Sequence, residues 1–310
     1  MSIPRFAPIA AVVVAVISWG VGPILVSSLS ISLSTTVLLR QLIWLPVLFL
    51  LAHLAGDGFT RHHFAVSWKP GIFFALSTGL GFGSFRETSI ANATLIGSLT
   101  PAVLLFIAPR LLGEKVTLQR VAYSIVSFFG VVAVVVGAES GSGAGQQGLL
   151  GDGLALGNML MWTVYFIAAK RARDEGINTW SFLTGICVVN VLLAIPWAVV
   201  SSNDLLDVPP RDWMFLVLMM LIPGTMGHYF MTWAQRYLDT TVSSLITLGG
   251  PVISTSLAFL FLGQSVSLLQ VLGGVVVLMG LGGVIVSAAT ARGAKSNEVG
   301  TVDPLLNSNP

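Results

Sequence analysis

Hydrophobic residues occur in long, nearly uninterrupted stretches, and polar residues gather in the segments between them. A helix needs about 20 apolar residues to cross the ~30 Å hydrocarbon core of a bilayer. Ten stretches reach that length, and most of the connections between them are short. The predicted spans are residues 6–27, 33–54, 69–88, 90–112, 116–137, 151–170, 178–200, 212–235, 240–262 and 266–289. The pattern predicts an all-α integral membrane protein with ten transmembrane helices.

Composition supports this assignment and excludes several classes of protein. Charged residues make up 9% of the 310 residues, whereas a soluble domain carries about 25%. Apolar residues make up 55%, which excludes a soluble Rossmann or TIM-barrel enzyme. The net charge of +2 is too small to indicate nucleic-acid binding, and a single cysteine, Cys187, excludes an internal disulfide and a cysteine-based zinc site. We expect no metal and no cofactor.

Basic residues predict the orientation of the chain in the membrane. With the N-terminus in the cytoplasm, twelve of the 15 Lys and Arg residues fall on the cytoplasmic side. Arg86 and Arg211 fall outside, and Arg40 lies within a span. Because cytoplasmic loops carry the excess of Lys and Arg, we expect a multi-pass protein of the plasma (inner) membrane with both termini cytoplasmic.

The chain repeats itself at an offset of 150 residues. Residues 90–137 align without a gap to residues 240–287, and the alignment pairs Pro101 with Pro251 and Gly130 with Gly280. The predicted organisation is therefore a first five-helix repeat (1–137), a Gly/Ser-rich linker (138–150), a second repeat (151–289) and a disordered cytoplasmic tail (290–310). Since five is odd, the second repeat enters the membrane from the opposite side. Inverted repeats are typical of secondary transporters, although duplication also builds larger bundles without transport.

Several motifs resemble the EamA family of the drug/metabolite transporter superfamily. Residues 112–117 (LGEKVT), with Gln119 and Gly130, are similar to the junction between spans 4 and 5 of that family. Residues 262–267 (LGQSVS) repeat the junction in the second half. The resemblance also includes the two paired prolines, the tryptophans of spans 1 and 6, and an eighth span with residues 224–228 (GTMGH) followed by Trp233 and Ala234.

This resemblance covers nearly the whole chain, about residues 8–288. It implies a ten-helix transporter, often an exporter, that moves small metabolites such as amino acids or drug-like compounds. One position departs from the family, which usually carries Glu at both junctions, because position 264 is Gln. We interpret Glu114 and Gln264 as span-end residues that make capping contacts.

Two ionisable residues lie inside predicted spans, and such residues are candidates for function. Arg40 lies about 10 Å below the outer end of span 2, at 1.5 Å per residue. It either attracts an anionic group into a cavity or snorkels to the interface or to a neighbouring carbonyl. His228 follows Pro223 and Gly224 in span 8. It either couples transport to protons or serves as a neutral, cavity-lining hydrogen-bonding residue.

Aromatic and amide side chains complete the predicted cavity. Trp19, Trp44 and Trp162 lie away from the span ends where tryptophan prefers to sit. Trp19 and Trp162 occupy equivalent depths and either stack on a substrate or fill helix crossings. The remaining polar candidates are Asn158, Tyr165 and Asn190, each of which serves equally well as an interhelical hydrogen-bonding group.

Prolines and glycines inside spans predict kinks or gating points. Pro101 and Pro251 are a symmetric pair, and Pro223 with Gly224 interrupts span 8. A static bend explains each of them equally well. The last predicted span is rich in glycine, which fits either internal packing or the interface of a homodimer.

We therefore predict a secondary transporter, not an enzyme, whose partners are a small-molecule substrate and the lipid bilayer. An intramembrane enzyme would need a catalytic constellation, and no Asp or Glu lies well inside any predicted span. The alternative is a membrane-embedded sensor or receptor without transport activity. With so few charges inside, the cavity is expected to favour neutral, zwitterionic or amphipathic substrates.

Overall fold

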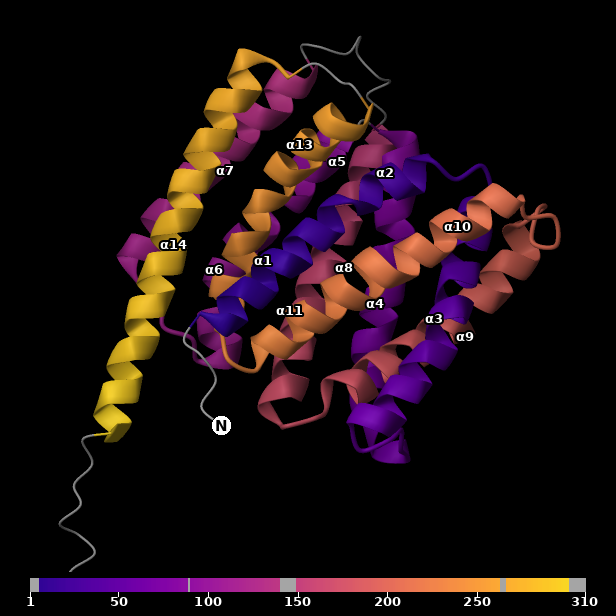
Figure 1. Cartoon of the computed structure of the whole chain (residues 1–310), viewed down its shortest axis with the longest axis horizontal. Helices are drawn as coiled ribbons and strands as arrows, with labels where there is room; N and C mark the ends of the chain where they lie inside the picture. The colour runs from indigo at the N-terminus through magenta and orange to yellow at the C-terminus, as the bar shows by residue number, and fades with distance from the viewer. Residues whose placement is uncertain (1–5, 89, 140–148, 263–265, 301–310) are drawn as a thin grey trace, which may run out of the picture.

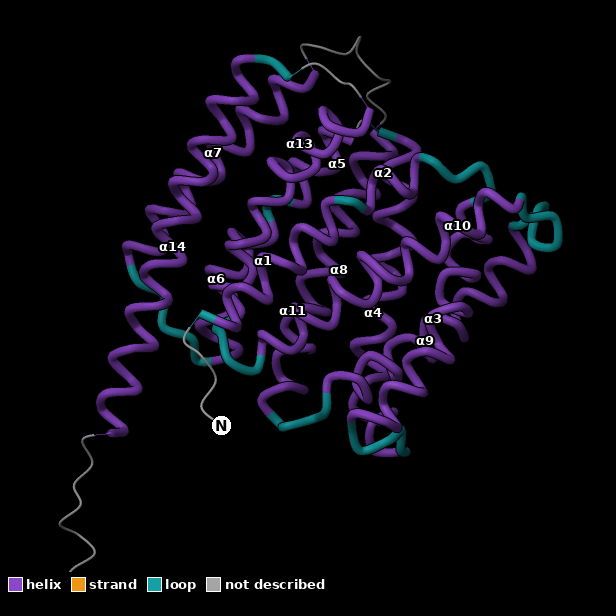
Figure 2. The backbone as a smooth tube through the Cα atoms, viewed as in Figure 1, coloured by secondary structure: helices purple, strands orange, loops and turns teal. Residues whose placement is uncertain are grey.

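The computed structural model describes residues 6–88, 90–139, 149–262 and 266–300, and throughout these ranges it contains helices and no strand. The helices pack side by side in one bundle (Figure 1) and are joined mostly by short loops (Figure 2). All ten apolar stretches are helical, so the all-α prediction is confirmed.

Each half of the chain contributes five groups of helices. The first half contains α1 (Ala7–Gly20) with α2 (Gly22–Ser27), α3 (Leu33–Ala55), α4 (Arg61–Glu87), α5 (Ile90–Gly97) with α6 (Thr100–Leu112), and α7 (Leu118–Glu139). The second half contains α8 (Leu149–Asp174), α9 (Thr179–Ser201), α10 (Pro210–Met219) with η1 (Met220–Gly227) and α11 (His228–Gln235), α12 (Thr240–Ile246) with η2 (Thr247–Gly249) and α13 (Gly250–Leu262), and α14 (Leu268–Gly300).

Side-chain caps explain where several helices begin. The side chain of Ser32 accepts a hydrogen bond from the backbone N–H of Thr35 at the start of α3. Thr60 forms a capping box with His63, so α4 begins at Arg61, earlier than the predicted span at residue 69. A cap of this kind satisfies backbone N–H groups that have no partner in the first helical turn.

The helix pair α5–α6 and the pair α12–α13 are interrupted at matching places. Ser98 and Leu99 separate α5 from α6, and the short 3-10 turn η2 separates α12 from α13. In both cases the second segment begins with a proline in its first turn, Pro101 or Pro251. Proline lacks an N–H group and is tolerated there. The paired prolines therefore mark helix breaks rather than bends within continuous helices.

The most extensive helix contact joins α7 to α14. A Cβ atom on Gly130 would lie 2.8 Å from the carbonyl oxygen of Gly273, and one on Gly280 would lie 2.9 Å from the carbonyl oxygen of Tyr123. Only glycine fits at such crossings. These glycines of α14 serve internal packing, and the homodimer stays a prediction.

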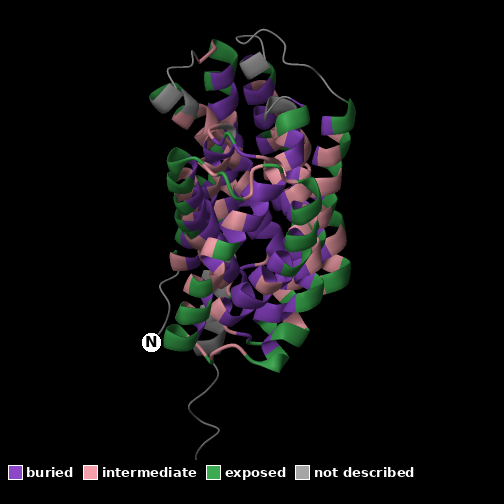
Figure 3. Ribbon diagram, turned by 90° about the vertical axis from the view of Figure 1, so that its right-hand side faces the viewer, coloured by how far each residue is buried: buried purple, intermediate pink, exposed green. Residues whose placement is uncertain are grey.

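Burial divides the molecule into an interior and an apolar outer surface. Buried residues fill the centre of the bundle, whereas exposed residues lie on its outside and at its ends (Figure 3). Large apolar side chains are exposed on the outside, among them Phe106, Phe129, Leu192 and Leu278. Seven helices or helix groups of the described chain are long and apolar enough to cross a membrane. Several helices therefore have the length and composition of membrane spans. The full count of ten spans stays a prediction.

One difference from the sequence prediction concerns the last helix. Helix α14 continues to Gly300, beyond the predicted span end at residue 289, and the disordered tail stays a prediction. Residues 140–148 of the predicted linker, position 264, and residues 301–310 lie outside the described residues.

Candidate functional site

A cavity of about 320 Å³ lies between the two halves of the chain. Its walls come from α1, α2, α3, α4, α5 and α6 of the first half and from α8, α10, η1, α11, η2 and α13 of the second. Five of the seven predicted cavity residues line it: Trp19, Arg40, Asn158, Trp162 and His228. The volume is at the lower end of the range for small-molecule pockets, about 300–1,000 Å³.

Four aromatic rings surround His228, and we call them the aromatic cage: Trp19, Trp44, Phe74 and Trp162. The centroid of the imidazole lies 4.8 Å from that of Phe74, 5.4 Å from that of Trp19 and 5.9 Å from those of Trp44 and Trp162. Trp19 and Trp162 meet edge to face, with centroids 5.3 Å apart and planes at 84°. Two of these rings come from α1 and α8, which the repeat equates. Edge-to-face packing of this kind fixes the rings in place.

The local structure of η1 explains how the cage is assembled. This segment is π-helical, a conformation that frequently occurs at functional sites. Pro223 has no N–H to offer the carbonyl of Met219, and a Cβ on Gly224 would lie 2.9 Å from that oxygen. The wider turn presents the hydroxyl of Thr225, which accepts a hydrogen bond of 3.0 Å from the indole N–H of Trp44. Pro223 also lines the cavity, whereas Gly224 lies behind it.

Arg40 is the cation of the cavity wall. The residue is 4% exposed, and its guanidinium carbon lies 5.2 Å from the centroid of Phe82. Its Nε atom is buried without a hydrogen-bond partner in the described chain. The indole nitrogen of Trp19 is likewise buried and unpartnered there. Buried polar groups normally have partners, so these two donors require an explanation.

Asn158 is the polar residue of the opposite wall. Its side-chain oxygen accepts a hydrogen bond of 2.7 Å from the hydroxyl of Ser77 on α4. A Cβ on Gly81 would lie 3.0 Å from the amide of Asn158, so glycine leaves the room that the amide occupies. The amide nitrogen of Asn158 therefore remains available as a donor on the cavity side.

The other two predicted residues lie away from the cavity. Tyr165 packs behind the cage, with its ring centroid 4.9 Å from that of Phe74 and 5.2 Å from that of Trp162. Asn190 is buried between α9 and α3, where it accepts a hydrogen bond from Gln41 and donates one to the carbonyl of Ile186. Both side chains support helices that form the site.

Sequence reasoning missed part of the site. Phe74 and Phe82 are ordinary phenylalanines of an apolar span, and nothing in the sequence marks them. Trp44 carried a signal, since it lies far from the span ends. Of the paired prolines, Pro251 lines the cavity and Pro101 does not.

One end of the bundle is closed by carboxylates of the second half, and we call it the Ser30 end. A single oxygen of Asp212 accepts hydrogen bonds from the backbone N–H groups of Ser30 and Ile31 and from the Ser30 hydroxyl. Arg86 donates a hydrogen bond of 2.8 Å to the carbonyl of Ile31. A second pocket of about 260 Å³ reaches this end and shares Pro23, Val26 and Phe85 with the main cavity.

A second carboxylate, Asp204, holds the start of α3 at the same end. It accepts hydrogen bonds from Ser32, Thr35 and Ser202. Partial burial raises the pKa of the Asp204 carboxyl, but these hydrogen bonds stabilise the charged form more strongly and lower the pKa to about 2.

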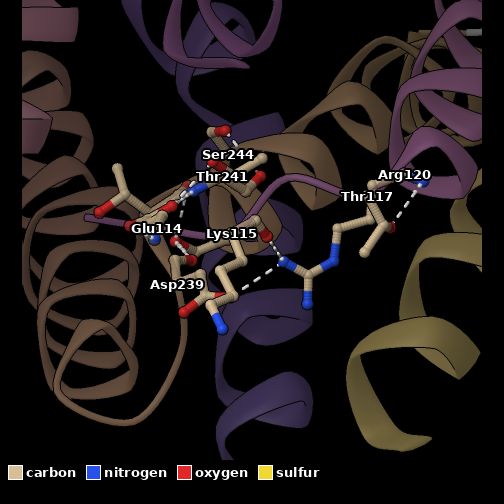
Figure 4. Close-up of polar contacts among 9 residues, drawn as sticks. Glu114, Lys115, Thr117, Arg120, Asp239, Thr241 and Ser244 are labelled. Atoms are coloured by element: carbon tan, nitrogen blue, oxygen red, sulfur yellow. Dashed lines mark hydrogen bonds and ion pairs between the residues drawn. The ribbon is translucent and has the colours of Figure 1, made fainter. Parts of the chain in front are cut away.

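The opposite end is closed by Glu114 of the first half, and we call it the Glu114 end (Figure 4). Glu114 accepts hydrogen bonds from the backbone N–H groups of Thr240 and Thr241 and from the hydroxyl of Thr241, so it caps α12. Next to it, Arg120 forms an ion pair of 2.9 Å with Asp239. Gly113, directly before Glu114, ends α6 in a left-handed backbone conformation (φ +66°), which favours glycine. The capping contact expected for Glu114 is present.

No group of three His, Cys, Asp or Glu side chains that could hold a metal ion occurs among the residues that the structure describes.

Comparison with known proteins decides the family. The model of the EamA-like transporter family matches the chain twice, over residues 7–136 and 149–286. The chain belongs to the EamA-like transporter family. This membership confirms the resemblance seen in the sequence motifs, and it agrees with the several apolar, membrane-length helices of the fold.

Named relatives of this EamA-family protein are distant. A Bacillus subtilis protein named as an uncharacterized transporter, YxxF, is 26% identical over 220 residues, which cover 68% of this chain and 66% of the relative, just under two thirds of its length. The aromatic amino acid exporter YddG of Ancylobacter novellus is 22% identical over 57% of this chain and 60% of its own. The pseudopaline exporter CntI of Pseudomonas aeruginosa is 22% identical over 82% of this chain and 86% of its own.

A solved crystal structure shares the fold. Its TM-score is 0.76 at 17% sequence identity, and the match covers 93% of this chain and 99% of the other.

Proposed function

We propose that this EamA-family protein is a secondary transporter that exports a small metabolite, an amino acid or a drug-like compound, by alternating access. The cavity between the halves would hold the substrate, with Trp19, Arg40, Asn158, Trp162 and His228 on its walls. Tyr165 and Asn190 would support these walls. The breaks at Pro101, Pro251 and Pro223–Gly224 would supply the hinges. The export direction rests on the two relatives that are named as exporters.

The contacts between helices support two inverted five-helix repeats. We equate the five groups of the first half with the five of the second, in order. The contact of α4 with α8 then corresponds to the contacts of α1 with η1 and α11, and that of α5 with α8 corresponds to those of α1 with α12 and α13. In the contacts of α3 with α9 and of α7 with α14, the two partners are equivalent helices, so exchanging the halves leaves each contact unchanged. Such exchange is expected of two halves related by a twofold axis in the membrane plane.

The position of the cavity supports an outward-facing state. With the N-terminus cytoplasmic, the Ser30 end is extracellular and the Glu114 end is cytoplasmic. The cavity is lined by the Ser30-end half of α4 (Phe74 to Phe85) and by Asn158 and Trp162 in the middle of α8, and it adjoins the second pocket. Toward the Glu114 end, a large apolar cluster that includes Val12, Leu104 and Val242 fills the bundle. A site that can open toward one side while the other side stays closed is what alternating access requires.

The observation that carries this proposal is a cavity with walls from both halves of the chain. Reconstituted protein should exchange at least one compound from a panel of labelled amino acids, amines and drug-like molecules across liposomes. His228→Ala, inside the cage, should lower that flux at least tenfold. Leu192→Ala, on the outer face of α9, should leave it unchanged, because Leu192 is 58% exposed and far from the cavity wall.

Two results would contradict the proposal. If wild-type protein moved no compound although one bound, the chain would act as a sensor or receptor. If His228→Ala transported as fast as Leu192→Ala, the cavity would not be the transport site.

Orientation has a separate test. In a Cys187→Ser background, a cysteine at the exposed residue Asp207 should react with an impermeant reagent applied to whole cells. A cysteine at the exposed residue Glu175 should react only after the membrane is opened. The reverse pattern would place both termini outside the cell.

A further inference from the structure

We propose that the substrate carries a carboxylate, which binds to Arg40, joined to an apolar group, which binds to the aromatic cage. The inference rests on the proposed function, since it concerns the same cavity, and it names the class of molecule that the cavity selects. Amines of the same shape would be rejected.

The first argument is that Arg40 has no counter-ion. Of the residues described, none is hydrogen-bonded or ion-paired to its guanidinium, which lies over the ring of Phe82. A buried cation is strongly destabilising unless it is paired. The planar guanidinium presents five N–H donors in a fork that matches the two oxygens of a carboxylate.

The second argument excludes the structural explanations of Arg40. A snorkelling arginine places its charged head in the interface, but this residue is only 4% exposed and lines the cavity. An arginine that caps a helix donates to free carbonyls. Arg171 does this at Leu111 in the last turn of α6, and Arg40 shows no such bond in the described chain.

The third argument is the polarity of the cavity along α4. Phe74 lies at the level of the cage and Phe82 at the level of Arg40, about 12 Å apart at 1.5 Å per residue. Between them lie Ser77 and the amide of Asn158. The cavity thus has an apolar aromatic region toward the Glu114 end and a cationic region toward the Ser30 end. A molecule with an acid group on an apolar body matches both.

The fourth argument is the absence of negative charge around the cavity. No Asp or Glu is among the described residues that line it, so an ammonium group on a molecule without a carboxylate would lack a counter-ion and would be repelled by Arg40. The Arg40 guanidinium and the amide of Asn158 supply hydrogen-bond donors on the cavity walls instead. The wall therefore offers donors to an acceptor-rich group.

Binding of three matched probes to purified full-length protein tests this inference. The probes are 3-phenylpropionate, 3-phenylpropanamide and 3-phenylpropylamine at pH 7, which share one ring and chain and differ in charge. By calorimetry, wild-type protein should bind the acid about tenfold or more tighter than the amide, and the amine most weakly. Arg40→Gln should bring the acid to the level of the amide, whereas Arg40→Lys should keep part of the preference.

The wild-type comparison needs no variant, so it stands even if Arg40→Gln does not fold. Equal binding of acid and amide, or no binding of the acid, overturns the inference. An acid preference in a protein that moves no compound would refute the proposed function and leave this inference intact. A third outcome is that wild-type protein and Arg40→Gln transport a neutral compound at equal rates and neither prefers the acid. That outcome would support the proposed function and refute this inference.

Discussion

The two ends of the bundle are held together by the same chemistry in different settings. At the Ser30 end, Asp212 and Asp204 of the second half accept hydrogen bonds from a loop of the first half. At the Glu114 end, a carboxylate of the first half accepts them from the start of a helix in the second half. Each end thus joins the two halves through a carboxylate and backbone N–H groups.

The ends differ in what lies beneath these contacts. Below the Ser30 end the second pocket leads to the main cavity, and a small apolar cluster that includes Leu25, Leu29 and Leu216 lies beside it. Above the Glu114 end lies the large apolar cluster, and the ion pair of Arg120 with Asp239 adds a further contact. Polar contacts with a small apolar cluster close one end, whereas polar contacts with a much larger apolar cluster close the other. We infer that opening the Ser30 end requires breaking fewer interactions.

The largest effect is expected from Asp212→Ala. Asp212 is 1% exposed, and its removal would take the acceptor from the N–H of the buried Ile31 and from the N–H and hydroxyl of the exposed Ser30. The loss should lower the free energy of unfolding by about 2–3 kcal/mol, measured by thermal unfolding in detergent. Because the Ser30 end would open more often, a cysteine at Ser254 on the cavity wall should react faster with an aqueous thiol reagent.

The control is Asp207→Ala, which changes an exposed acid in the neighbouring loop. It should alter neither the stability nor the labelling rate. An unchanged labelling rate in Asp212→Ala would show that the Ser30 end does not limit access to the cavity.

Glu114→Ala is expected to lower the free energy of unfolding by less than Asp212→Ala does, and to change the labelling rate in the opposite direction. The residue is only half-buried, and water can replace part of its contacts with Thr240 and Thr241, so the loss should be about 1–2 kcal/mol. Weakening the Glu114 end favours conformations in which that end is open. Labelling of Ser254→Cys from the Ser30 side should therefore become slower.

Glu114→Gln is the matched control, because the amide keeps one acceptor oxygen and should lose less stability. Faster labelling from the Ser30 side in Glu114→Ala would contradict the idea that the two ends open in alternation.

Sequence reasoning predicted the elements of this comparison unevenly. Ten apolar stretches and the paired prolines gave the helices and the places where two of them break, because span length and the missing N–H of proline are local properties. The mid-span positions of Arg40 and His228 pointed to the cavity, because ionisable groups are rare inside a membrane.

The remaining parts depend on tertiary contacts. Asp204 and Asp212 read as ordinary loop acids, and only the fold shows that they bind the loop at Ser30. Phe74 joins the cage because α4 packs against α8, which no local pattern encodes. Asn190 has the same chemistry as Asn158 but faces Gln41, since its helix face is set by the contact of α9 with α3.

A still smaller effect is expected for the ion pair at the Glu114 end. The side chain of Asp239 is 43% exposed, so solvent screens its attraction to Arg120. A double-mutant cycle with Arg120→Gln and Asp239→Asn should give a coupling of about 0.5–1 kcal/mol in the free energy of unfolding. High salt should reduce this coupling. A coupling well above that range would mean that the ion pair, and not the apolar cluster, closes the Glu114 end.

The smallest effect is the pH dependence of the Ser30 end. The pKa of Asp204 is about 2 in the folded protein and 3.8 ordinarily, so the folded state favours the charged form. Its contribution to stability is complete above about pH 4 and is lost as the pH falls toward 2. The unfolding temperature of wild-type protein should therefore fall between pH 5 and pH 2.5 more steeply than that of Asp204→Asn, which cannot titrate. The extra slope should be slight, because the carboxylate is largely in contact with water. Equal slopes in the two proteins would mean that the serine and threonine contacts of Asp204 contribute nothing to closing the Ser30 end.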